Sequence, residues 1–402
     1  MKPAAATTAT ALHEACSKGR IEIVREILLL GSVDKEAQDK NGATPLHAAC
    51  AAGKAEVVRE LLAAGANCNA VNGVKRTPLH QAAACFAKDA AGEIVKLLVQ
   101  AGANKDAVAA DGATPLHLAS FNNSPRVVEA LLAAGANKDI ADKRQDTPLH
   151  MAAMANRRDI VRMLLQRGAQ PDLRNNNGQT PLHLTAQEGH LDSTRELIHG
   201  GADKDAVDNA SWTPLSMACS KGRVEVAREL LQAGANKELA DKYGAAPLHR
   251  ACAEGHLEVV RLLIQSGCNL ENAVHEGSPL YHGYTPLHEA SRQGRADVAK
   301  LLIQNGANKD AKDKDGRTPL HAACNDGHIA VVEELLASGA NKEAVDKDGS
   351  TPLHLACTSS KGTAVVPILL SAGANKNARD SKGKTPAERT TKKEILALIS
   401  KP

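Results

Sequence analysis

Histidine and cysteine are the side chains of this 402-residue chain that could bind a metal or act as bases and nucleophiles. Most of the sixteen histidines and nine cysteines recur at fixed intervals along the sequence. Ten histidines end one tetrapeptide or a degenerate copy of it. Catalysis needs unlike groups brought together, whereas these rows repeat a single group. The pattern therefore predicts structural histidines, with no catalytic site, metal or cofactor.

Six of the cysteines follow an alanine at one repeated position, which indicates a small buried site. Equivalent residues of stacked helices lie about 8 to 10 Å apart, beyond the roughly 7 Å Cα separation that a disulfide allows. Reduced thiols are expected, since no C-x-x-C pair suggests zinc or redox chemistry. The metalloprotease, P-loop, nucleophile-elbow and kinase motifs are also missing, so we expect no enzyme. The six residues are Cys16, Cys50, Cys219, Cys252, Cys324 and Cys357.

The tetrapeptide Thr-Pro-Leu-His marks a repeat with a period of 33 residues. In the copy that starts at Thr44, threonine can cap a helix and Pro45 suits its first position. Gly53 breaks this helix, and apolar residues at helical spacing then predict a second helix that ends at Gly65. A polar, glycine-containing finger with a tight turn follows. Repeats start near residues 10, 44, 77, 114, 147, 180, 213, 246, 285, 318, 351 and 385.

This pattern resembles the ankyrin-repeat family, through T-P-L-H, A-A, a glycine break, V-V-x-x-L-L and G-A-N, over about residues 10–399. The resemblance implies an all-α ankyrin-repeat solenoid, with a helix-turn-helix and a β-turn finger in each repeat of a curved superhelical stack. Eleven full repeats and a truncated C-terminal cap are expected. Residues 1–9 would form a tail and residues 10–402 a single domain, with polar outer faces on the terminal repeats.

Three irregularities interrupt the repeat. Four extra residues within 84–91 should lengthen the first helix of repeat three by one turn. Six extra residues before Thr285 should lengthen a finger. Ser193 and Thr194 replace apolar residues in repeat six, where weaker packing and a hinge are a hypothesis.

The six aromatic residues are the most informative departures from the pattern. Trp212, Tyr243 and Tyr284 fall in three consecutive fingers and should form one exposed stripe. Tyr281 lies in the lengthened finger and Phe121 on a first helix. The resemblance implies that these variable positions contact the partner, and aromatic hot spots are worth about 2 kcal/mol or more each. The alternative is that each ring only covers its own or a neighbouring finger.

Basic residues around repeat five form a second candidate site for an acidic partner, with Arg144 and Arg157 as contact residues. Nearby aspartates offset this charge, so a solvated helix face is the alternative. The other members of the basic cluster are Lys143, Arg158, Arg162 and Arg174.

Charge and hydropathy restrict the class of partner. The net charge of +3 does not favour nucleic acid, and no apolar run is long enough to span a membrane. We expect a monomer in the cytoplasm, or alternatively the nucleus, that binds other proteins. The expected function is a scaffold or adaptor that holds a partner on the concave face formed by fingers and first helices. A regulatory, inhibitory or targeting subunit of an enzyme is the alternative.

Overall fold

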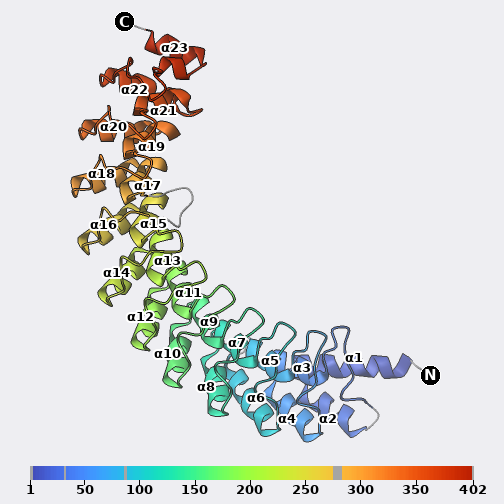
Figure 1. Cartoon of the computed structure of the whole chain (residues 1–402). Helices are drawn as coiled ribbons and strands as arrows, with labels where there is room; N and C mark the ends of the chain where they lie inside the picture. Colours follow the sequence, from blue (N-terminus) through green and yellow to red (C-terminus); the bar gives the residue numbers. More distant parts are fainter. Residues whose placement is uncertain (1–2, 31–32, 86–87, 275–282, 401–402) are drawn as a thin grey trace. The chain divides into compact units, whose positions relative to one another are not determined.

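The computed structural model describes residues 3–30, 33–85, 88–274 and 283–400. It divides into two compact units, the first comprising residues 1–185 and 190–203, and the second residues 186–189 and 204–402. Over the described residues the regular elements are helices, and no strand is present. Within each unit, first helices lie between a row of fingers and the second helices (Figure 1). The predicted all-α repeat architecture is confirmed.

The helices follow one another in pairs. The first six pairs are α1 (Pro3–Lys18) and α2 (Ile21–Leu29), α3 (Pro45–Ala51) and α4 (Ala55–Ala63), α5 (Pro78–Ala84) and α6 (Lys88–Gln100), α7 (Pro115–Phe121) and α8 (Pro125–Ala133), α9 (Pro148–Met154) and α10 (Arg158–Gln166), α11 (Pro181–Glu188) and α12 (Leu191–His199).

The next pairs are α13 (Pro214–Ser220) and α14 (Val224–Gln232), α15 (Pro247–Glu254) and α16 (Leu257–Gln265), α17 (Pro286–Arg292) and α18 (Ala296–Gln304), α19 (Pro319–Asp326) and α20 (Ile329–Ala337). Repeat eleven comprises α21 (Pro352–Thr358), a short 3₁₀ turn η1 (Gly362–Ala364) and α22 (Val366–Ser371). The chain ends with η2 (Ala387–Arg389) and α23 (Lys393–Ile399), the truncated twelfth repeat.

The tetrad histidine joins consecutive repeats. In repeat ten, the backbone N–H of Thr318 donates to Nδ1 of His321 over 3.1 Å, while Nε2 of His321 lies 3.0 Å from the carbonyl oxygen of Ser350 in the next finger. Since Nδ1 accepts, Nε2 carries the proton and donates. The same arrangement recurs along the chain, and it holds the ring in its neutral form.

Carboxylates and small buried side chains complete the stacking. Asp310 accepts the backbone N–H of Asn341 in the following repeat over 2.8 Å, and the equivalent residues do the same elsewhere. Along the second helices, Arg59 donates to Glu93 of the next repeat over 2.8 Å. All nine cysteines are free and buried, which confirms the prediction made for the six at the repeated position.

The insertion in repeat three lies in a different helix from the one predicted. The first helix α5 has seven residues like α3, whereas the second helix α6 has thirteen residues against nine in α4. The expectation of a lengthened first helix is therefore wrong. The extended backbone of Cys85, with φ −67° and ψ 134°, ends α5, so the additional turn begins α6 instead. The insertion before Thr285 spans residues outside the described part, but its base closes where Gly283 N–H donates to Val274 O over 2.9 Å.

The two terminal repeats differ in the polarity of their surfaces. In repeat one, Leu29 and Leu30 are 86% and 73% exposed, at positions where most repeats carry alanine or polar residues. The expected polar outer surface is therefore wrong for the second helix of repeat one. In repeat twelve, Ile395 and Ile399 are buried while Lys393 and Glu394 are exposed, which fits the expectation.

Candidate functional site

Trp212 and Arg250 form the centre of the candidate site in repeats seven and eight. Trp212 precedes α13 at the end of a finger, and Arg250 lies on the first helix α15. The guanidinium carbon of Arg250 is 4.7 Å from the centre of the Trp212 ring, which is cation–π geometry. Arg250 Nε also donates to Asp241 Oδ2 over 2.9 Å, so the guanidinium is fixed by both an aromatic ring and a carboxylate.

Tyr243 is connected to this centre through the same aspartate. The second oxygen of Asp241 accepts the backbone N–H of Tyr243 over 2.8 Å, which sets the conformation of the finger. The Tyr243 ring is 45% exposed, and Nζ of Lys242 lies 5.0 Å from its centre. Trp212, Lys242, Tyr243 and Arg250 are called the Trp212–Tyr243 surface below.

Two structural residues of the repeat are replaced at this surface. Repeat seven has Ser216 in place of the tetrad histidine, and repeat eight has Ala246 in place of the capping threonine. The Ser216 hydroxyl lies 3.1 Å from the hydroxyl of Thr213 in its own tetrad. The departures from the stabilising pattern thus coincide with the two aromatic fingers. Function commonly accounts for such local losses of structural consistency.

Tyr284 lies in the next repeat and differs in character from the other two aromatic residues. Its ring stacks on His288, with 5.2 Å between centres and 28° between planes, and it is half-buried. Burial, followed by the Asp313 carboxylate, raises the pKa of the Tyr284 phenol to about 12. The structure brings Trp212 and Tyr243 together through Arg250 and Asp241, whereas the Tyr284 ring packs within repeat nine. Tyr281 lies outside the described residues.

The remaining candidate residues lie in the first unit. Phe121 is 44% exposed at the end of α7, and Arg157 Nε donates to its carbonyl oxygen over 2.9 Å. Arg144 lies 3.3 Å from an oxygen of Asp146 and is exposed. The structure therefore gives Arg157 an inter-repeat contact and Arg144 a carboxylate partner.

Three further arginines of the basic cluster are also engaged within the protein. Arg158 and Arg162 both donate to Glu196 of the next repeat. The hydrogen bond from Arg162 is the largest cause that lowers the pKa of Glu196 to about 2; burial opposes this shift, and Arg158 adds to it. Arg174 donates to the Gly178 carbonyl oxygen over 3.0 Å. An acidic ligand would have to compete with these internal acceptors.

Arg250 and Asp241 are the residues that the sequence analysis missed. Arg250 follows the tetrad histidine at a position that holds alanine, leucine, methionine or glutamine in most other repeats. A lone arginine there, one repeat after the single tryptophan, was the available signal.

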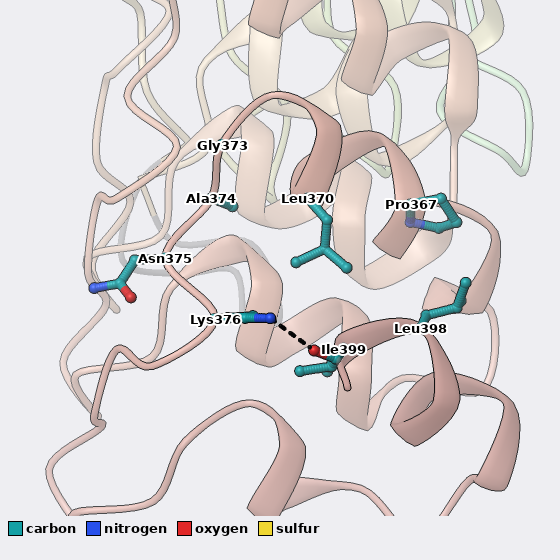
Figure 2. A pocket seen from close by; sticks show the side chains of 8 residues that line it. All are labelled: Pro367, Leu370, Gly373, Ala374, Asn375, Lys376, Leu398 and Ile399. Atoms are coloured by element: carbon teal, nitrogen blue, oxygen red, sulfur yellow. Dashed lines mark hydrogen bonds between the residues drawn. The ribbon is translucent and has the colours of Figure 1, made fainter. Parts of the chain in front are cut away.

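An open pocket of about 620 Å³ lies between α22 and α23 (Figure 2). Lys376 Nζ donates to the carbonyl oxygen of Ile399 over 3.2 Å at its side. A comparable pocket follows α14, where Lys237 donates to Ser266 O over 2.5 Å, so these hollows belong to the repeat geometry. The pocket residues are Pro367, Leu370, Gly373, Ala374, Asn375, Lys376, Leu398 and Ile399.

The described residues contain neither a candidate metal-binding cluster nor a helix that could span a membrane. No group of three or more histidine, cysteine, aspartate or glutamate side chains could hold a metal ion there. In the same part of the chain, no helix has both the length and the apolar character needed to cross a bilayer.

Comparisons with known proteins agree with the architecture. The family description "Ankyrin repeats (3 copies)" matches residues 12–107, 79–175, 116–208, 167–241, 233–313 and 305–380. Among solved structures, the human ASB11 ankyrin repeat domain is similar at 30% identity and a TM-score of 0.50, over 57% of this chain and 99% of that chain. A search of curated proteins finds no match. With tetrads, stacked helix pairs and family matches spanning residues 12–380, the chain belongs to the ankyrin-repeat family.

Proposed function

We propose that this chain is a non-catalytic scaffold or adaptor that binds a partner protein on the face formed by its fingers and first helices. Ankyrin repeats are generally protein-interaction modules, and this gives the class of function. The proposed docking site is the Trp212–Tyr243 surface, extended by Tyr284 in repeat nine. The coincidence of two aromatic fingers with the loss of the structural residues at Ser216 and Ala246 carries this assignment.

The geometry supports a preformed docking site. Asp241 fixes both Arg250 and the Tyr243 finger, so little side-chain entropy remains to be lost when a partner binds. A half-buried tryptophan beside an exposed tyrosine also gives the amphipathic contact area that is typical of interface hot spots.

The test is affinity capture from a cell extract with the wild-type chain and with the triple variant Trp212→Ala, Tyr243→Ala, Tyr284→Ala. The partner bound by the wild type should be recovered at least tenfold less with the triple variant, because hot-spot truncations cost about 2 kcal/mol each. Val345→Ala removes an apolar side chain with the same 45% exposure as Tyr243 from another finger and should leave recovery unchanged. Equal recovery with a folded triple variant would place the docking site elsewhere.

A further inference from the structure

We infer that the Trp212–Tyr243 surface docks an extended acidic segment of its partner protein. This inference rests on the proposed function, because it specifies the chemistry of what that surface binds. Two observations carry it: the cations on the faces of the two aromatic rings, and the exposed ammonium of Lys242, with which no described carboxylate forms an ion pair.

Each aromatic ring of this surface already has a cation on one face. The Arg250 guanidinium lies 4.7 Å from the Trp212 ring centre, and the Lys242 ammonium lies 5.0 Å from the Tyr243 ring centre. A cation–π site attracts positive charge through the face of the ring. A lysine or arginine of the partner would meet the resident cations there and be repelled, so a basic segment is disfavoured.

In the Tyr243 finger an aromatic residue follows the lysine, where two other fingers have an aspartate. In the fingers that hold Lys314-Asp315 and Lys347-Asp348, an aspartate follows the lysine and balances its charge. Tyr243 replaces this aspartate after Lys242. Lys242 is exposed and forms no ion pair with any described residue. Its charge is therefore available to a carboxylate of the partner.

Asp208 and Asp241, which close the two fingers, do not offset that charge at the surface. Asp208 and Asp241 are buried, and each closes its own finger by accepting two backbone N–H groups. Asp241 additionally binds Arg250. Glu254, one helical turn beyond Arg250 on α15, is the exposed carboxylate of that helix and should oppose an acidic partner.

The spacing of the fingers suits an extended chain. Consecutive repeats lie about 8 to 10 Å apart, which about three residues of extended backbone span. An acidic residue near Lys242 and an apolar residue against Trp212 could therefore come from one short segment. Surface ion pairs of this kind contribute modestly to binding and weaken as salt rises.

The probe is a phage-displayed library of random 12-residue peptides, selected on the wild-type chain. Selected peptides are then sorted by loss of binding to the variant Trp212→Ala, Tyr243→Ala. Peptides that depend on these rings should carry net negative charge. Their affinity, read from the fluorescence of the single tryptophan, should fall about three- to tenfold in Lys242→Glu and rise in Glu254→Gln. Lys347→Glu, at the equivalent finger position, is the matched control and should have no effect.

The outcomes separate this inference from the proposed function. Ring-dependent peptides that are neutral or basic, or that bind Lys242→Glu as tightly as wild type, would overturn the acidic segment but leave the docking site intact. Peptides that ignore both rings would refute the site and the inference together. Enrichment of no peptide would refute the extended segment as the occupant.

Discussion

Lowering the pH should unfold this protein well before its carboxylates are protonated, because the buried tetrad histidines must remain neutral. Burial, the largest cause, lowers the pKa of His80, His249, His288 and His321 from 6.5 to about 4. In each ring Nδ1 accepts a backbone N–H of the same tetrad. A proton added to Nδ1 would break that hydrogen bond inside the stack.

The sign and size of the effect follow from proton linkage. Because the folded pKa is depressed, the unfolded chain binds more protons, so the contribution is fully present above pH 6.5 and is lost as pH falls towards 4. Between pH 7 and pH 5, each of these four histidines should lower the free energy of unfolding by about 1.8 kcal/mol, or by about 7 kcal/mol together. The pKa values of His47, His117 and His150 are also lowered, mainly by burial, and add in the same direction.

The assay is the urea midpoint of unfolding, followed by circular dichroism at half-unit steps from pH 7 to pH 5. Glu196 titrates outside this window, because its hydrogen bond to Arg162 is the main cause that lowers its pKa to about 2. His321→Ser introduces the residue that repeat seven has at the equivalent position, Ser216. This variant should be less stable than wild type at pH 7. Its free energy of unfolding should fall by about 1.8 kcal/mol less than that of wild type between pH 7 and pH 5. His199→Ser, at an exposed position on α12, controls for removal of an imidazole.

A midpoint that stays constant from pH 7 to pH 5 would refute the reasoning, since it would mean that the buried rings accept protons without cost. Equal pH dependence in wild type and His321→Ser would refute the assignment to the tetrad histidines.

Three further outcomes are expected. Arg250→Met should remove the cation that covers Trp212 and so shift the tryptophan emission to longer wavelength; unchanged emission would contradict the stacking. The same variant leaves Asp241 buried without its ion pair, which should lower the free energy of urea unfolding by about 1 to 3 kcal/mol. Ser193→Val should raise hydrogen-exchange protection of repeat six by about 1 kcal/mol, because valine or isoleucine fills this position in neighbouring repeats; lower protection would show that the hydrogen bond from Ser193 to Asn156 contributes more than the apolar contact. Gly327→Ala should lower the thermal midpoint, since its φ is +73° and a Cβ would collide with a backbone oxygen of the next repeat; an unchanged midpoint would show that the backbone can shift freely.

The repeat architecture could be predicted because each signal was local and recurred. Thr-Pro fixes a helix start and glycine fixes a helix end through backbone conformation alone, so twelve copies reinforce one another. The prediction for the insertion in repeat three was wrong because no such local signal exists there. The number of extra residues is evident from the sequence, but only the packed structure decides which helix contains them. The extended conformation of Cys85 made that choice.

Repeat six shows how far a substitution pattern can be interpreted. Ser193 and Thr194 were expected to weaken the packing, and both are fully buried. Ser193 donates to Asn156 of the preceding repeat over 2.8 Å, and Thr194 lies 3.0 Å from the hydroxyl of Thr185, itself a replacement for alanine. Hydrogen bonds therefore replace apolar contacts here. The partners of these hydroxyls lie in other parts of the stack, so no local sequence pattern reveals these hydrogen bonds. The hinge in repeat six remains a hypothesis.

The candidate site was predictable in its rings but not in its charges. Trp212 and Tyr243 were evident as rare side chains in regular fingers, whereas their connection depends on Asp241, a residue that most fingers share. The aspartate at this position closes its finger in other repeats as well. Asp241 closes the Tyr243 finger and also accepts a hydrogen bond from Arg250, which fixes the stacked guanidinium. In the proposed docking site, one arginine thus gives a structural aspartate a second role. A repeat protein can acquire binding specificity in this way, because the backbone positions that specificity needs already exist for stacking.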